Sequence, residues 1–187
     1  MITGFGWKWL EAGIPYTGRE LSSRWVTAHT GQDGDTAVLF MGECHVATED
    51  LVDNDDREAG ATIEAAAMLH VVIMHPGCDL RSAVLRQRLL VCILCESLAS
   101  REVTTERRGD DVFVDERKLT VSIAAPSSDA CLIHLGINTD PAGAPVAAIG
   151  LEELGVDPHD LGDELMTRYA QELATAAYAE TKVREVD

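Results

Sequence analysis

Lysine is rare in this chain, and one lysine lies where a chemical site could use it. The 187 residues contain Lys8, Lys118 and Lys182 against twelve arginines. Lys118 begins an alternating segment, Lys118–Ala124, that is typical of a half-buried strand. A compact ammonium there suits a phosphate or a developing negative charge better than a planar guanidinium would. The alternative, which spacing alone favours, is a lysine that reaches water from a strand edge and protects that edge from pairing.

Cys44 and His70 form a second candidate group. A neighbouring histidine could lower the pKa of Cys44 and create a thiolate nucleophile for acyl transfer. His45 is adjacent in sequence, so on an extended segment its side chain points the other way, and His70 from a neighbouring strand is the better partner. The structural alternative, a core thiol with hydrogen-bonded histidines at positions 70 and 75, is favoured.

The acidic segment 49–56 resembles a cation-binding loop in composition only. It lacks the central glycine and the closing glutamate of a calcium loop. A solvated acidic loop is therefore expected, and no metal site is predicted.

Composition limits the classes of partner. Hydrophobic residues make up 46% of the chain, as in a globular protein, and the net charge is −17. This charge disfavours nucleic acid and anionic membranes as partners. Met1–Gly13 does not have the pattern of a signal peptide. The five cysteines are odd in number, and Cys92 and Cys95 lie in an apolar run, which favours free buried thiols in a reducing cytoplasm.

The elements that would position these residues alternate between sheet and helix. Strands are expected at 36–41, 68–75, 111–114, 118–124 and 131–137, and helices at 80–98 and 160–181. Helices separated by closely spaced strands indicate an α+β fold, a mainly antiparallel sheet flanked by helices. We expect one domain over residues 1–187, with residues 1–15 as a candidate N-terminal extension.

Three sequence elements lie in order around Lys118. Arg107-Arg108-Gly109-Asp110-Asp111 precedes one strand, Asp115-Glu116-Arg117-Lys118 turns into the next, and His134-Leu135-Gly136-Ile137-Asn138 ends the third. This order resembles the biotin and lipoate protein ligase superfamily. Its members carry an Arg-Asn-Asp-type element, a lysine on the following strand, and a strand that closes on Gly-x-Asn.

Further matching stretches extend over nearly the whole chain. They are Tyr16–Leu21, Leu51–Asp53, Met68–His70, Val84–Val91, Lys118–Ala124 and Leu132–Asn138. On these residues the chain is identified as a member of the family catalogued as domain of unknown function 366. The fold that this family is believed to share with the ligases is a mixed sheet flanked by helices, in agreement with the elements above.

The resemblance implies roles for individual residues. In the ligases the lysine that matches Lys118 contacts the acyl-adenylate near its reacting carbonyl and phosphate, where its charge stabilises the transition state. Asp110 and Asp111 would then act with it as catalytic residues, positioning Lys118 or a metal-bound nucleotide. Asn138 and Gly136 would bind substrate in the same cleft. ATP with Mg²⁺ is the cofactor that the resemblance suggests.

Two features depart from the ligase pattern. The glycine-rich, arginine-bearing loop of the ligases has its best match in Met41–His45, which contains Gly42, an acidic residue in place of arginine, and Cys44. Gly42, Cys44 and His70 are therefore included as candidate substrate-binding residues. Val121 stands where the ligases have a glycine, and its branched side chain would crowd a nucleotide on that strand. These departures predict transfer from a pre-activated thioester, or the loss of adenylation.

Two function classes follow. The first is an enzyme, an acyltransferase or an adenylate-forming ligase, that binds an activated acyl group against Lys118. The second is a non-catalytic module that holds a nucleotide or a small acid on the same scaffold. Both take a small-molecule ligand, and a sheet with so many edges favours a homodimer. A structural or nucleic-acid-associated role is weakest because the chain is acidic.

Overall fold

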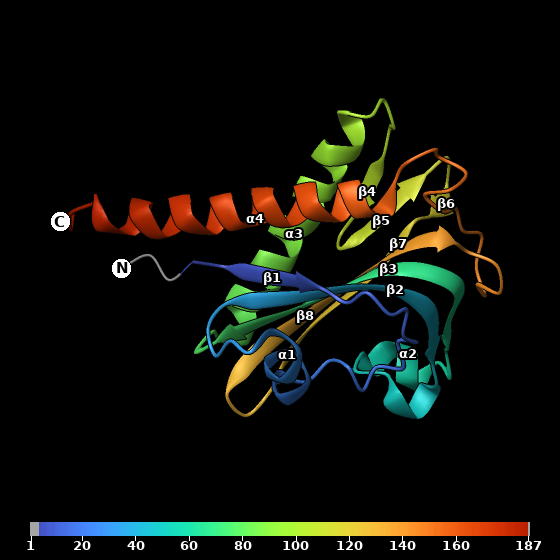
Figure 1. Ribbon diagram of the computed structural model, residues 1–187, viewed down its shortest axis with the longest axis horizontal. Coiled ribbons are helices and arrows are strands. Elements are labelled where there is room, and N and C mark those ends of the chain that lie inside the picture. The colour runs from blue at the N-terminus through green and yellow to red at the C-terminus, as the bar shows by residue number, and fades with distance from the viewer. Residues whose placement is uncertain (1–3, 187) are drawn as a thin grey trace.

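Five strands form the main sheet of the computed structural model, which describes residues 4–186 (Figure 1). They are β1 (Gly6–Trp9), β2 (Thr36–Val46), β3 (Ile63–Pro76), β7 (Thr120–Pro126) and β8 (Ala130–Asp140). The spatial order is β1-β2-β3-β8-β7, in which β1 runs parallel to β2 and every other neighbouring pair is antiparallel. The α+β class and the mainly antiparallel sheet expected from the sequence are therefore confirmed.

The two central strands, β3 and β8, are long and apolar, and both of their faces are covered. On β3, Leu69, Val71 and Ile73 point to one face, whereas Met68 and His70 point to the other. Covering both faces removes the apolar–polar alternation that an exposed strand would show, so these strands appear in the sequence as continuous apolar runs.

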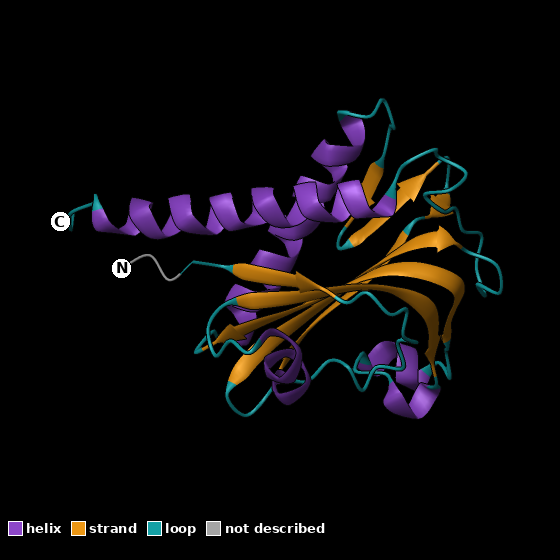
Figure 2. Cartoon of the chain, viewed as in Figure 1, coloured by secondary structure: helices purple, strands orange, loops and turns teal. Residues whose placement is uncertain are grey.

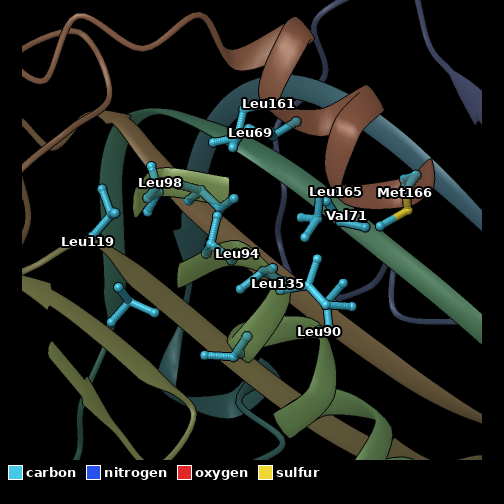
Figure 3. Packing of buried hydrophobic residues seen from close by; sticks show 14 of the residues in the cluster. Leu69, Val71, Leu90, Leu94, Leu98, Leu119, Leu135, Leu161, Leu165 and Met166 are labelled. Carbon is cyan, nitrogen blue, oxygen red and sulfur yellow. The ribbon is translucent and has the colours of Figure 1, made fainter. Parts of the chain in front are cut away.

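Two helices cover one face, here called the helix face. They are α3 (Leu80–Ala99) and α4 (Pro158–Thr181), and the side chains of Asp79 and Asp157 cap their N-termini. Their apolar residues interlock with those of β3 and β8, and Leu94, Leu135 and Leu165 lie together in this core (Figure 3). Burying such leucines stabilises the fold by about 1.5–3 kcal/mol each.

The opposite face, here called the cleft face, is covered by shorter elements (Figure 2). They are α1 (Ser23–Thr30), a 3₁₀ turn η1 (Thr48–Asp50) and α2 (Asn54–Glu58). The chain before α1 also lies here, where Tyr16 pairs with Cys44 of β2. Tyr16, Val26 and Phe40 belong to the second hydrophobic cluster, which packs on this face.

A second sheet of three short strands carries Lys118. Its strands are β4 (Glu106–Arg108), β5 (Asp111–Val114) and β6 (Arg117–Lys118), all antiparallel. The expectation of one continuous strand over 118–124 is wrong, because the chain passes from the small sheet to the main sheet at Leu119. The Leu119 side chain is fully buried and its N–H donates to the carbonyl of Val112, which breaks the local alternation.

Other expected elements are found, most with longer bounds, and five elements were missed. The helices expected at 80–98 and 160–181 correspond to α3 and α4. The missed elements are β1, α1, η1, α2 and β4. Strand β1 lies within the expected N-terminal extension, where Gly6–Trp9 pairs with β2. No helix within residues 4–186 combines the length and apolar character needed to cross a membrane.

Candidate functional site

A cleft of about 560 Å³ lies between the short elements of the cleft face and the small sheet. One wall is formed by η1, α2 and the residues around them, and the other by the small sheet with the loop 144–148. Strands β3, β7 and β8 supply the base through Met68, Val121, His134 and Asn138. The residues that line the cleft therefore come from segments that are far apart in the sequence.

Lys118 lines this cleft and is held in place from two sides. Its Nζ lies 2.9 Å from Asp111 Oδ2, and both side chains are half-buried. Burial raises the pKa of Asp111 above its ordinary value, although the charge of Lys118 offsets part of this effect. Asn138 Nδ2 donates to the Lys118 carbonyl at 3.1 Å. Three residues expected to act together, Lys118, Asp111 and Asn138, thus lie within one contact network.

Asp110 also lines the cleft, but it is tied to α3 and not to Lys118. Its carboxylate accepts a hydrogen bond from Gln87 Nε2 at 2.9 Å and lies 3.1 Å from Arg88 Nη1. Gln87 also donates to Ser122 Oγ on β7 at 2.8 Å. The pair Asp110–Arg88 therefore fixes the start of β5 against α3, so the two aspartates have different neighbours.

Gly136 leaves room between three residues that line the cleft. A Cβ at this position would lie 3.0 Å from Met68 Cε, 3.1 Å from Val121 Cγ2 and 3.2 Å from His134 Cε1. Any larger side chain would displace these neighbours. Gly136 does not itself line the cleft, but it allows Met68, Val121 and His134 to pack closely at the base.

His70 does not line the cleft, but it contacts a histidine that does. His70 Nδ1 lies 3.1 Å from His134 Nε2, and the Tyr16 ring stacks on His134 with centroids 3.8 Å apart and planes within 9°. Burial lowers the pKa of His70 to about 4 and the pKa of His134 well below its ordinary value. Both rings are consequently neutral at neutral pH.

Gly42 and Cys44 lie beneath the N-terminal segment, outside the cleft. A Cβ on Gly42 would fall 1.8 Å from the Ile14 carbonyl oxygen, so the glycine allows the two backbones to approach. Burial and two nearby glutamates raise the pKa of Cys44 to about 12. These surroundings favour the core-thiol alternative for Cys44 and do not form an open loop of the ligase type.

The cleft is strongly acidic. Seven carboxylates line it: Asp50, Asp53, Asp55, Asp56, Glu64, Asp110 and Asp111. Among the lining residues that the structure describes, Lys118 is the one lysine or arginine. The segment that the sequence predicts as a solvated acidic loop therefore forms one wall of the cleft.

These residues do not fit ATP with Mg²⁺ in the way the resemblance implies. Within residues 4–186, no three His, Cys, Asp or Glu side chains could hold a metal ion by themselves, so Mg²⁺ would depend on the phosphates for its other ligands. The segment around Gly42, the best match to a nucleotide loop, is packed under Ile14. A polyphosphate would also meet an acidic wall, which repels it.

His134, Tyr16 and the acidic wall are the parts of the site that sequence reasoning missed. One signal was available for His134, because His134, Gly136 and Asn138 alternate along a strand and must share a face. No comparable signal joins Tyr16 to this group, since it stacks on His134 only once the chain has folded.

Comparison with known proteins identifies the family. The model of the family described as "Domain of unknown function (DUF366)" matches residues 6–184. An uncharacterised protein of Methanocaldococcus jannaschii is 35% identical over 167 residues, which cover 86% of this chain and 76% of that protein. A solved protein of unknown function from Pyrococcus horikoshi is also 35% identical, with a TM-score of 0.89 over 97% of this chain and 100% of that one.

More distant solved structures share the fold. The biotin protein ligase from Aquifex aeolicus, in complex with biotin and ATP, gives a TM-score of 0.60 at 16% identity, over 90% of this chain and 70% of that one. A lipoate-protein ligase A bound with ATP gives 0.53 at 13% identity, over 92% and 94%. The family and fold expected from the sequence are both confirmed: the chain belongs to the family of domain of unknown function 366 and has the fold of the biotin and lipoate protein ligases.

Proposed function

We propose that the cleft binds an acyl group, as a carboxylic acid or a thioester, and places its carbonyl carbon near Lys118 for transfer to an acceptor. The observation that carries this proposal is the position of Lys118. It is the one cationic side chain among the described lining residues, and Asp111 holds its Nζ at 2.9 Å. A fixed ammonium beside an apolar base is suited to a ligand with one negative end.

The chemistry that this geometry supports is transfer from a thioester. The acceptor's nucleophilic atom adds to the carbonyl carbon, the carbon–sulfur bond breaks, and the thiol leaves with the proton that the acceptor gives up. Negative charge develops on the carbonyl oxygen, where the Lys118 ammonium stabilises it. Asp111 orients the ammonium, and Asn138 fixes the backbone that carries it.

A thioester fits the cleft better than an adenylate does. Its acyl carbonyl is uncharged, whereas a nucleotide triphosphate would bring several negative charges toward the acidic wall. Val121 adds a branched side chain to the base of the cleft, in the position that the resemblance assigns to a glycine. Both features agree with the departures from the ligase pattern noted in the sequence.

The second candidate function is a small-acid or nucleotide binding module without turnover. The specific observation in its favour is the excess of carboxylates around a single lysine that is already paired with Asp111. Because the Lys118 ammonium is already paired with Asp111, it stabilises the negative charge of a transition state less strongly. It can still hold a ligand.

Calorimetric titration with octanoate and with octanoyl thioester tests the proposal. We expect Lys118→Met to weaken binding roughly 10- to 100-fold, because a hydrogen bond to a charged group contributes about 1.5–3 kcal/mol. The matched control is Lys182→Met, which removes an exposed lysine distant from the lining residues and should leave binding unchanged.

Turnover separates the two functions. Release of free thiol from octanoyl thioester in the presence of amine or thiol acceptors would favour the acyltransferase. Binding without thiol release would favour the module. ATP–pyrophosphate exchange with the same acid would reveal adenylation and would contradict the preference for a thioester. If Lys118→Met bound both ligands like the wild type, the site assignment would be wrong.

A further inference from the structure

Strand β7 is an outer strand of the main sheet, and one of its two backbone edges pairs with no other strand. It pairs with β8 alone, in an unbroken antiparallel register from Thr120 to Pro126 (Figure 1). Natural sheets usually protect such an edge with a charged side chain, a proline or a bulge. Residues 120–125 contain no charged side chain and no proline, and their register shows no bulge. This edge is therefore able to pair with another molecule.

The hydrogen bonds at the two ends of the β7–β8 ladder show which residues face the free edge. Asn138 N–H donates to the Leu119 carbonyl at 2.9 Å, and Ser127 N–H donates to the Ala130 carbonyl at 2.7 Å. In an antiparallel pair, every second residue exchanges hydrogen bonds with the partner strand. The odd-numbered residues of β7 therefore bond to β8, and the N–H and C=O of the even-numbered residues point away from it.

Ser122 is the residue that brings this free edge into the cleft. Of the other outward-facing residues, Thr120 is fully buried, Pro126 has no N–H, and Ala124 does not line the cleft. No hydrogen bond within residues 4–186 uses the N–H or the C=O of Ser122. Its hydroxyl is already engaged, since it accepts from Gln87 Nε2 at 2.8 Å. Ser122 thus offers the cleft a backbone donor and a backbone acceptor side by side.

The size of the free edge favours a small ligand over a protein strand. Ser122 and Ala124 are the two residues of β7 with outward N–H and C=O groups that are not fully buried, whereas strands usually have about 5–6 residues. A second copy of this chain would also bring a further net charge of −17. The cleft volume of about 560 Å³ is in the range of small-molecule sites. A small ligand with an amide group, which has both a donor and an acceptor, matches these two backbone groups.

The position of Ser122 relative to Lys118 indicates which part of the ligand it would meet. The two residues are four apart in sequence, so their Cα atoms are separated by at most roughly 14 Å, and both line the cleft. A thioester carbonyl beside Lys118 has an acyl chain on one side and a thiol part on the other. The acyl chain suits the apolar base at Met68 and Val121, which leaves the β7 edge to the thiol part.

We propose that the backbone of Ser122 binds a secondary amide in the thiol part of the donor thioester. The Ser122 N–H donates to the amide carbonyl oxygen, and the Ser122 C=O can accept an amide N–H from the same arm. The substrate class is a thioester whose thiol carries an amide two carbon atoms from the sulfur. This inference rests on the proposed function for the carbonyl at Lys118, whereas the free edge depends only on the pairing of β7 with β8.

Amide hydrogen exchange, followed by nuclear magnetic resonance on the full chain without ligand, tests the free edge. The N–H groups of Val121 and Ile123 bond to β8 and should be protected, whereas those of Ser122 and Ala124 should exchange at least about tenfold faster. Protection of Ser122 equal to that of Val121 would overturn the inference. Protection of Ser122 that disappears on dilution would place a second copy of the chain at this edge and would overturn it too.

Two thioesters of equal chain length test the amide. S-octanoyl-N-acetylcysteamine has the amide and S-pentyl octanethioate lacks it, and calorimetry gives the ratio of their dissociation constants. Ser122→Pro removes the N–H but no bond to β8, because this N–H points outward. We expect the preference for the amide to fall roughly three- to tenfold in this variant, because one hydrogen bond is lost.

Two control variants separate the N–H from other effects of the substitution. Ser122→Ala keeps the N–H and removes the hydroxyl that Gln87 contacts. Ala124→Pro places a proline at the next outward-facing position, outside the lining of the cleft. Both should keep the wild-type ratio. An equal fall in Ser122→Ala would assign the effect to the hydroxyl, and an equal fall in Ala124→Pro would assign it to proline itself. Either result would overturn the role of the Ser122 N–H.

The outcomes distinguish this inference from the proposed function. If both thioesters bind in a Lys118-dependent way but the ratio is the same in the wild type and in Ser122→Pro, only the role of Ser122 is overturned. If neither thioester binds the wild type, the proposed function fails as well. Should Ser122→Pro not fold, exchange of the Ser122 N–H in the wild type decides. It should slow with the N-acetylcysteamine thioester and not with the pentyl thioester, and equal rates would overturn the inference.

Discussion

Strand β3 carries two buried histidines, His70 and His75, an odd number of residues apart, so they face opposite sides of the main sheet. On the helix face, His75 Nε2 lies 2.9 Å from the Tyr169 hydroxyl, and Asp35 Oδ1 lies 3.2 Å from Nδ1, off the line of a hydrogen bond. On the cleft face, His70 Nδ1 lies 3.1 Å from Nε2 of His134, which lines the cleft, while His70 Nε2 has no hydrogen-bond partner within residues 4–186.

The difference shows how burial can serve two purposes in one strand. The groups around His75 belong to the protein itself: α4 supplies Tyr169, and Arg86 lies 3.6 Å from the carboxylate of Asp35. That network joins helix to sheet and is enclosed by the protein, with His75 Nδ1 left without a hydrogen-bond partner in the described part of the chain. The network around His70 includes His134, which lines the cleft. A network enclosed by the protein indicates a structural role, whereas a network that reaches a cleft can contact a ligand.

The largest effect is expected from breaking the helix-face core. Leu94→Ala removes a fully buried side chain from the cluster shown in Figure 3 and should lower the free energy of unfolding by about 2–5 kcal/mol. Chemical denaturation measures this change. Leu85→Ala on the same helix, where the side chain is 63% exposed, should change it by less than about 0.5 kcal/mol. Equal losses in the two variants would contradict the placement of the core.

The next effect distinguishes the two histidines by pH. The folded-state pKa of His70 is about 4, below that of an unfolded histidine, so the unfolded state binds more protons between these values. Stability should therefore fall as pH drops from about 6.5 toward about 4, with His70 contributing about 3 kcal/mol, and should be independent of this group above that interval. Denaturation at several pH values between 5 and 7 measures the slope.

Two variants show which histidine, and so which face of the sheet, causes this dependence of stability on pH. His70→Phe should remove much of it. His75→Phe should remove less, because burial lowers the pKa of His75 but the nearby Asp35 carboxylate acts in the opposite direction. If His75→Phe reduced the pH dependence of stability more than His70→Phe does, the expected order of the two histidines would be wrong.

The smallest effect concerns the contact between His75 and Tyr169 alone. Tyr169→Phe removes the hydroxyl that meets His75 Nε2 and should cost about 1–2 kcal/mol of stability without altering ligand affinity. Tyr178→Phe, at a position 61% exposed on the same helix, is the control and should be nearly neutral. A loss of ligand affinity in Tyr169→Phe would show that the two faces are coupled.

Elements with strong periodicity were predictable from the sequence. The helix expected at 80–98 is α3, because Asp79 caps its start and its apolar residues recur with helical spacing. Strand β3 was expected at 68–75 from its β-branched apolar run. Strand β1 has only four residues, Gly6–Trp9, and it forms by pairing with β2, so its local sequence carried little signal.

The end of β6 shows a limit of local patterns. Alternation continues from Lys118 through Leu119 to Ile123, yet the strand breaks between the first two residues. Backbone partners decide this: Lys118 N–H donates to the carbonyl of Ala147, whereas Leu119 N–H donates to Val112. These partners lie on other segments, so no window around residue 118 contains the information.

The candidate site was predictable in part for the same reason. Lys118 and Asp111 are near in sequence and were expected together, as they are found at 2.9 Å. His70 and His134 are far apart in sequence, and their contact requires the pairing of β3 with β8. The acidic residues Asp53 and Asp55 were recognised as a loop, but only the fold turns that loop toward the cleft.

The pairing of β3 with β8 also bears on the order in which the protein folds. The whole of α3 and the small sheet lie between these strands in sequence, so their pairing requires the closure of a long stretch of chain, which is typical of slow folding. His134 and Met68 come together only at that step. A ligand in the cleft therefore recognises the finished molecule alone, and it should slow unfolding without speeding refolding.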